Sequence, residues 1–258
     1  MKIVVLIKEV PDTYGERKLS LETGLADRAA GDVVMDEIGE RAIEVALSYA
    51  DANADTEVIL LSMGPESAQA TIRKGLAMGA TRAVQVADEK LLGADLLLTS
   101  EVLAAALSRL EADLIIAGNQ STDGSGGVLP SMLAERMNLP QLTFLSSVEI
   151  TADKVSGNRA TDAGNATVSA ELPAIISVTE ALPDGRFPNF KGIMAAKKKP
   201  FETLSTADLG VDVERLDIPR VIMTTAAAKP PRSAGVKIVD DGDAGRKLAE
   251  FLIENKLV

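Results

Sequence analysis

Four short apolar segments alternate with amphipathic helical patterns through the first 140 residues, and this alternation constrains the fold more than any other feature. The apolar segments are residues 3–7, 57–63, 82–86 and 114–117, and the helical patterns cover residues 36–49, 65–78, 95–110 and 129–137. Short, continuously apolar strands indicate burial on both faces, as in a parallel sheet whose crossovers are helices. The sequence therefore predicts an α/β fold with a doubly wound, mostly parallel sheet.

After Pro140 the pattern changes. Alternating or apolar runs separated by turn residues predict antiparallel strands that extend the sheet; they cover residues 142–150, 154–159, 167–172 and 174–178. A strand-like segment at 221–225 then leads into an extended, Pro-containing arm, and residues 243–256 follow as a helix. Because such an arm builds no core of its own, we expect its helix to pack on a second chain.

Charge and composition exclude several classes of function. A formal net charge of −11 would repel a nucleic-acid backbone, and an aromatic content of 3% leaves few platforms for stacking bases. Cys and His are both absent, which removes thiolate metal sites, imidazole bases and Ser-His-Asp triads. No carboxylates are spaced as metal ligands, and no nucleophile has a convincing base, so we expect neither a metal site nor catalytic residues.

The sequence also bears on location. It contains no run of 18 apolar residues, and its first residues form a strand pattern without a signal peptide. We therefore expect a cytoplasmic protein that does not insert into a membrane.

The stretch from residue 114 to residue 130 combines a strand, a small-residue loop and a helix start. The loop reads NQSTDGSGG after Gly118, and its glycines allow a ligand to approach the backbone closely. Free N–H groups and the helix dipole favour an anion at such a place, so the loop is a candidate phosphate site. It matches neither a GxGxxG nor a P-loop fingerprint, and an ordinary loop that caps the helix is the alternative.

A second candidate site lies in residues 182–201, LPDGRFPNFKGIMAAKKKPF. Phe187, Phe190, Ile193 and Met194 are costly to leave exposed in a loop unless a partner covers them. The basic run Lys197, Lys198 and Lys199 follows directly. Apolar side chains beside a basic cluster favour docking of an acidic partner, whereas the simplest alternative is a solvated loop.

Several motifs together resemble the family of electron transfer flavoprotein beta subunits, and the resemblance covers essentially the full length. They are VLIKEVPDTY, MGPESAQATIRKGLAMGATRAV, LIIAGNQSTDGSGG, LPAIISVTE, FPNFKGIMAAKKKP, TADLGV and SAGVKI. FPNFKGIMAAKKKP with TADLGV and SAGVKI is the most specific combination. The resemblance implies a nucleotide-binding domain at 1–181, a partner-recognition loop at 182–200, and a C-terminal arm and helix at 201–258 that pack on the alpha subunit.

The resemblance also implies the cofactors and their residues. AMP would be bound structurally in this chain, and a redox-active FAD would be held mainly by the alpha subunit. The AMP pocket would comprise Leu6, Asp36, Glu37, Ile38, Gly39, Met63, Gly118, Asn119, Gln120, Ser121, Thr122, Asp123, Gly124, Ser125, Gly126, Gly127, Val128 and Leu129. Tyr14 would lie near the alpha-subunit flavin, and Phe190 would be the apolar anchor of the recognition loop beside Lys197, Lys198 and Lys199.

The implied function is that of a non-catalytic subunit in a heterodimeric electron carrier. Electrons would arrive from acyl-CoA and related dehydrogenases, as in fatty acid oxidation, and leave toward a quinone reductase. Two alternatives stay open: a free-standing adenine-nucleotide sensor, and a bifurcating flavoprotein subunit with a second FAD in the AMP pocket. Of the bifurcating loop, Asp-Gly-Asp-Thr followed by Gln-Val-Gly, only Asp123 and Gly124 match here.

Overall fold

The computed structural model describes residues 1–215, 218, 220–232 and 235–258. The first two residues of the SAGVKI motif, 233 and 234, lie outside the described residues. The chain divides into two units, Met1–Thr224 and Thr225–Val258, which are treated separately below.

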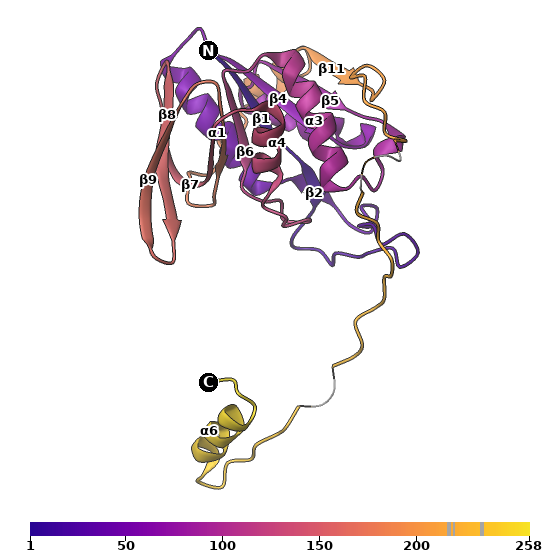
Figure 1. Ribbon diagram of the computed structural model, residues 1–258, viewed down its shortest axis with the longest axis vertical. Coiled ribbons are helices and arrows are strands. Elements are labelled where there is room, and N and C mark those ends of the chain that lie inside the picture. The colour runs from indigo at the N-terminus through magenta and orange to yellow at the C-terminus, as the bar shows by residue number, and fades with distance from the viewer. Residues whose placement is uncertain (216–217, 219, 233–234) are drawn as a thin grey trace. The chain divides into compact units, whose positions relative to one another are not determined.

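The first unit is built on a twisted sheet of nine strands within the described residues (Figure 1). Its order is β11-β5-β4-β1-β6-β10-β7-β8-β9, and the pairs from β11 to β7 are parallel. The strands are β1 (Lys2–Leu6), β4 (Glu57–Met63), β5 (Arg82–Val86), β6 (Leu114–Gly118), β7 (Gln141–Ile150), β8 (Lys154–Thr161), β9 (Gly164–Glu171), β10 (Ala174–Val178) and β11 (Phe201–Leu204). The predicted doubly wound, mostly parallel α/β sheet is confirmed.

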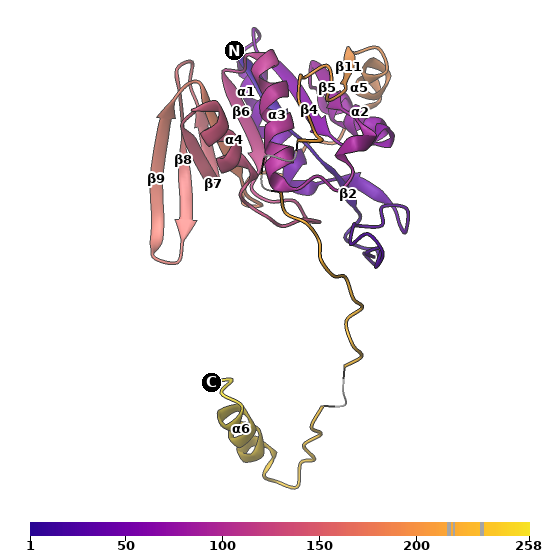
Figure 2. The same cartoon turned by 45° about the vertical axis from the view of Figure 1, so that its right-hand side comes forward.

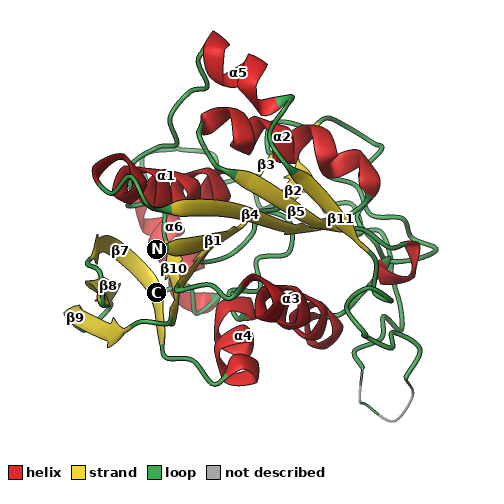
Figure 3. Ribbon diagram, turned by 90° about the horizontal axis from the view of Figure 1, so that it is seen from above, coloured by secondary structure: helices red, strands yellow, loops and turns green. Residues whose placement is uncertain are grey.

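Helices cover both faces of the sheet (Figure 3). One face carries α1 (Glu37–Ala52) and α2 (Gln69–Met78), and the other carries α3 (Leu96–Leu110) and α4 (Leu129–Met137). Successive strand residues point to opposite faces, so Ile3 and Val5 belong to the core under α1 and α2, whereas Val4 belongs to the core under α3 and α4. Burial on both faces is the reason that these strands have continuously apolar sequences.

Short elements complete this unit. Two 3-10 helices, η1 (Glu66–Ala68) and η2 (Glu89–Leu91), precede α2 and α3. A separate two-stranded antiparallel sheet pairs β2 (Glu9–Pro11) with β3 (Val33–Met35). The first predicted strand, with its apolar core at residues 3–7, ends at Leu6 as β1, and a separate strand, β2, starts at Glu9. The polar segment between β2 and β3 is an irregular excursion with one isolated bridge, between Leu19 and Ala26.

The prediction of four antiparallel strands after Pro140 is wrong for β10. β10 inserts between β6 and β7 and is parallel to both. Within the described residues of the nine-stranded sheet, only the pairs β7–β8 and β8–β9 are antiparallel. All five residues of β10 are buried, whereas β9 is mostly exposed. A continuously apolar strand therefore belongs inside the parallel sheet here as well, and its position late in the chain misled the prediction.

The segment at 182–201 is not a loop throughout. It contains α5 (Phe190–Ala196), which starts at the cap residue Asn189 and lies against α2 (Figure 2). Phe201 begins β11, which pairs with β5 at the sheet edge. The first unit continues to Thr224, so the expected arm boundary at 201 falls inside it. Four residues with an exposed middle give too short a pattern for β11 to be recognised from sequence.

No strand forms at residues 221–225, where the sequence pattern predicts one. Val221 and Ile222 are exposed, and no neighbouring strand among the described residues pairs with them. The second unit contains α6 (Ala244–Glu254), which confirms the helix expected at the end of the chain.

Candidate functional site

The switch in strand order lies between β1 and β6. From β1 the chain adds β4 and β5 on one side, and it then crosses to place β6 on the other side of β1. Leu6 at the end of β1 is in register with Ala117 near the end of β6. In open α/β sheets ligands bind outside the carboxyl ends of the strands at this point. Lys8 and the loop 118–129 both follow these strand ends.

Asp36 connects this loop to the start of α1. One carboxylate oxygen of this buried residue accepts the N–H of Ile38, at 3.2 Å, and so caps the helix. The other accepts the N–H of Thr122, at 2.8 Å, and its hydroxyl, at 3.3 Å. Ile38 also lies directly over Gly118, where a Cβ would come within 2.9 Å of Ile38 Cγ2. The helix start and the loop are therefore held together by both packing and hydrogen bonds.

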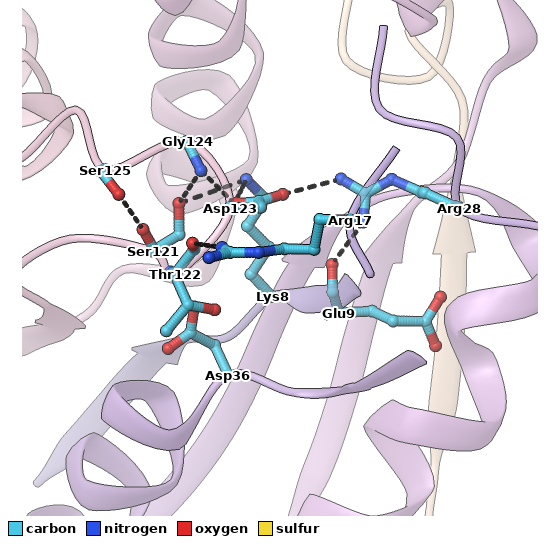
Figure 4. Close-up of polar contacts among 10 residues, drawn as sticks. All are labelled: Lys8, Glu9, Arg17, Arg28, Asp36, Ser121, Thr122, Asp123, Gly124 and Ser125. Atoms are coloured by element: carbon cyan, nitrogen blue, oxygen red, sulfur yellow. Dashed lines mark hydrogen bonds and ion pairs between the residues drawn. The ribbon is translucent and has the colours of Figure 1, made fainter. Parts of the chain in front are cut away.

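Asp123 is held by two cations (Figure 4). Lys8 Nζ lies 2.7 Å from one carboxylate oxygen and Arg28 Nη2 lies 3.0 Å from the other. The N–H of Gly124 also donates to the first oxygen, at 2.6 Å. Burial alone would raise the pKa of Asp123, but the hydrogen bond and charge of Lys8, with contributions from Ser121 and Gly124, lower it to about 2. Asp123 is therefore ionised, and the group of three side chains formed by Lys8, Arg28 and Asp123 carries one surplus positive charge.

That surplus is increased by Arg17, which donates to the backbone carbonyl of Thr122. Arg28 makes a second bond, from Nη1 to the Glu9 carbonyl at 2.9 Å. Both arginines come from the excursion between β2 and β3. The excursion therefore brings cations to the outer side of the loop.

Several polar groups of the loop, at its start and at its end, have no partner within the described residues. The side-chain oxygen of Asn119 is buried without a hydrogen bond. In the described part of the chain, the backbone N–H groups of Gly126, Gly127 and Val128 donate to no protein acceptor, and α4 has no side-chain N-cap. Buried polar atoms are normally hydrogen-bonded, and helix N-termini attract anions. These open groups belong to the loop that Lys8, Arg17 and Arg28 also contact, and they suit a phosphorylated ligand with a polar base or sugar.

The structure brings most of the predicted pocket residues to this edge of the sheet. Leu6, Met63 and Leu129 are half-buried and pack on the same core cluster, and Gly39 lies against Ile7. Glu37 is exposed in the first turn of α1, and no hydrogen bond or ion pair among the described residues joins it to the loop. The remaining predicted residues belong to the α1 start and the loop, which contact each other; they are Asp36, Ile38 and residues 118–128.

Sequence reasoning missed Lys8, Arg17 and Arg28. The sequence position of Lys8 could have revealed it, because Lys8 directly follows the first apolar strand and so lies at the same sheet edge as the loop. Nothing in the sequence pattern indicates Arg17 and Arg28, because they lie in an irregular segment without periodicity. Tyr14 is 97% exposed in a turn of that segment, where its N–H donates to the Asp12 side chain.

The predicted docking residues differ in exposure. Phe187 and Phe190 are 97% and 79% exposed, and Ile193 and Met194 about half. Lys197 and Lys198 are exposed, but Lys199 points inward. Its Nζ donates to the carbonyls of Leu76, at 2.9 Å, and Ala80, at 2.6 Å, at the end of α2. Two of the three lysines are therefore available to a partner.

A search of the described residues for other sites finds no group of three or more acidic side chains arranged to hold a metal ion. The helices in the described ranges are all too short or too polar to cross a membrane.

Comparison with known proteins gives consistent matches. The electron transfer flavoprotein domain matches residues 24–209. The electron transfer flavoprotein subunit beta of Mycobacterium leprae is 45% identical over 99% of each chain, and that of Megasphaera elsdenii is 32% identical over the full length of both. The caffeyl-CoA reductase-Etf complex subunit CarD of Acetobacterium woodii is 34% identical over 83% of this chain and 82% of its own.

The family match covers most of the chain, and the beta subunits of Mycobacterium leprae and Megasphaera elsdenii match it over nearly its full length. The chain therefore belongs to the electron transfer flavoprotein family, as a beta subunit.

Proposed function

We propose that this beta subunit pairs with an alpha subunit that holds most of the redox-active FAD, and that it binds AMP as a structural nucleotide. The heterodimer is a cytoplasmic electron carrier. It accepts electrons from acyl-CoA and related dehydrogenases and delivers them to a quinone reductase. This chain contributes nucleotide binding and partner recognition but no catalytic residue.

The observation that carries the AMP assignment is the cationic, donor-rich loop at the strand-order switch. Lys8, Arg17 and Arg28 supply three positive charges there, and Asp36 and Asp123 supply two negative ones. Both carboxylates already accept hydrogen bonds within the protein. A phosphate in this loop would therefore interact with the cations and with the open amides before α4. Asn119 offers a buried oxygen to a hydroxyl or amine of the same ligand. When bound, AMP adds no redox chemistry and stabilises the loop.

Docking by the partner-recognition segment, residues 182–200, is supported by its exposure. Phe187 and Phe190 form an apolar surface, and Lys197 and Lys198 lie beside it. Exposed phenyl rings next to free lysines fit an acidic protein surface with an apolar pocket. Lys199 is assigned to the fold instead, because its ammonium group is bonded to the end of α2.

The alternative with a second FAD in place of AMP is kept because of one relative. CarD, a relative at 34% identity, is named as a subunit of a caffeyl-CoA reductase-Etf complex. In this chain, however, only Asp123 and Gly124 match the bifurcating motif, and the glycine-rich run continues from Gly124 to Gly127. We therefore place AMP ahead of FAD.

Nucleotide release tests the proposal. The chain is coexpressed with its alpha subunit, the complex is purified and denatured, and the released nucleotides are separated by chromatography. We expect one AMP and one FAD per heterodimer. Two FAD and no AMP would establish the bifurcating alternative, and a colourless monomer that binds ATP reversibly would establish a sensor.

A further inference from the structure

The partner-recognition segment is fixed to two helices before any partner arrives. α5 packs so closely on α2 that a Cβ at Gly192 would lie 2.5 Å from the Ala77 carbonyl oxygen. Arg73 on α2 donates to the Ala196 carbonyl, at 2.8 Å, and Lys199 binds the α2 end. These contacts secure the C-terminal part of the segment, from Gly192 onward.

The N-terminal part of the segment depends on α1. Arg41 donates to the Leu182 carbonyl and pairs with Asp184. Gly185 packs against Glu40, where an added Cβ would lie 3.0 Å from Glu40 Cβ. These contacts end before Arg186, the residue that directly precedes Phe187.

Arg186 binds α1 through more contacts than any of these neighbours. Nε and Nη2 donate to the two oxygens of Glu44, both at 2.8 Å, and the backbone N–H of Arg186 adds a third bond at 3.0 Å. Nη2 also lies 2.9 Å from Asp51. Glu44 is largely buried, and the bonds from Arg186 outweigh its burial and lower the pKa of its carboxyl. A two-bond fork between a guanidinium and a carboxylate fixes both position and direction.

This arrangement bears directly on the two exposed rings. Phe187 follows Arg186, and Phe190 follows after Pro188 and the cap residue Asn189. Phe187 is 97% exposed and Phe190 is 79% exposed, so the described residues leave both rings largely uncovered. If this segment were mobile, a partner would have to order it on docking, and that ordering would lower the affinity. A segment that is already fixed avoids this loss.

We infer that Arg186 is a positioning residue for partner docking, which holds Phe187 and Phe190 in their docking arrangement by fixing the backbone before them to Glu44 and Asp51 of α1. The inference rests on the proposed docking function. It assigns the residue a role in how readily a dehydrogenase is bound and none in electron transfer itself.

The test compares Arg186→Gln with the wild type in the intact heterodimer. Amide hydrogen exchange across residues 187–196 is expected to quicken by about tenfold when the fork is lost. With a purified acyl-CoA dehydrogenase and its acyl-CoA as electron source, KM for the heterodimer should rise several-fold while kcat and the flavin spectrum stay unchanged. Phe190→Ala, which removes a docking side chain itself, should raise KM without changing the exchange.

Three further variants separate positioning from general damage. Arg186→Lys keeps the charge but loses the fork and should fall between the wild type and Arg186→Gln. Glu44→Gln should shift both readouts in the same direction as Arg186→Gln but less, because Arg186 keeps its pair with Asp51. The double variant should be no worse than Arg186→Gln, because both changes break the same fork. Arg136→Gln breaks bonds to Ser100 and Leu97 on the opposite face of the sheet and should change neither readout.

The outcomes are separable. Unchanged exchange in Arg186→Gln, or faster exchange with an unchanged KM, would overturn the positioning role. If the wild-type heterodimer accepts no electrons from the dehydrogenase, the proposed docking function fails, and the exchange comparison still decides whether Arg186 fixes the segment.

Discussion

At the scale of single residues, Asp123 shows how an acidic chain builds a site for an anion. The chain has 27 basic against 38 acidic residues, a net charge of −11, and yet three of the basic side chains contact one loop. Asp123 holds Lys8 and Arg28 in place, and its own charge is thereby neutralised. The sequence identified Asp123 as a site residue, but its role in gathering cations depends on partners 95 and 115 residues away.

The lowered pKa of Asp123 makes its contribution to stability depend on pH. Its pKa falls from an ordinary 3.8 to about 2, so the ionised form is favoured by folding. The stabilisation is fully present above pH 3.8 and is lost as the pH falls through about 2. Allowing for solvent screening of the half-exposed Lys8, we expect about 1–2 kcal/mol.

Asp123→Asn measures that contribution. The free energy of unfolding, from urea titrations, should be lower in the variant by about 1–2 kcal/mol at pH 6, and the difference should vanish toward pH 2. A difference that is independent of pH, or that grows on acidification, would contradict the assigned ion pairs.

At the scale of elements, the contact between α5 and α2 requires a glycine. Gly192 lies over the last turn of α2, and the atom that an added Cβ would meet, 2.5 Å away, is the backbone oxygen of Ala77. A backbone atom cannot turn aside as a side chain can, so α5 itself must move. Lys199 and Arg73 hold α5 from the other end and oppose that movement.

Gly192→Ala should therefore destabilise the protein by about 1–3 kcal/mol, the usual effect of overpacking. Gly245→Ala in α6 is a matched control, since nothing lies within 4 Å of its added Cβ. There the better helix propensity of alanine should leave stability unchanged or raise it by up to about 1 kcal/mol. Thermal unfolding of both variants gives the comparison, and equal losses at the two positions would refute the close contact.

At the scale of the whole molecule, the two units differ in how they are stabilised. The first contains both hydrophobic core clusters. The second contains α6, none of whose residues is buried, although Leu248 and Ile253 are large apolar side chains. An amphipathic helix with no buried residue has an apolar side left to pack on a partner, and in the proposed heterodimer we expect that partner to be the alpha subunit.

Truncation after Thr224 tests this division. Because the first unit contains both hydrophobic core clusters, we expect the melting temperature to stay within about 2 °C of the full-length value. Copurification with the alpha subunit should be lost or strongly weakened. An unfolded truncated chain, or undiminished copurification, would contradict the division.

The sequence by itself determined the doubly wound sheet, because the alternation of apolar strands and amphipathic helices is local and repeats four times. The caps at Asp36 and Asp95 are equally local, since a capping side chain acts within its own first turn.

Only the tertiary structure decided the features that join distant parts of the chain. It placed β10 parallel between β6 and β7, brought Lys8 and Arg28 to Asp123, and turned Lys199 toward α2. The physical reason is range: strand direction and the choice of a charged partner are set by packing across the sheet, which leaves no periodic mark near the residues concerned.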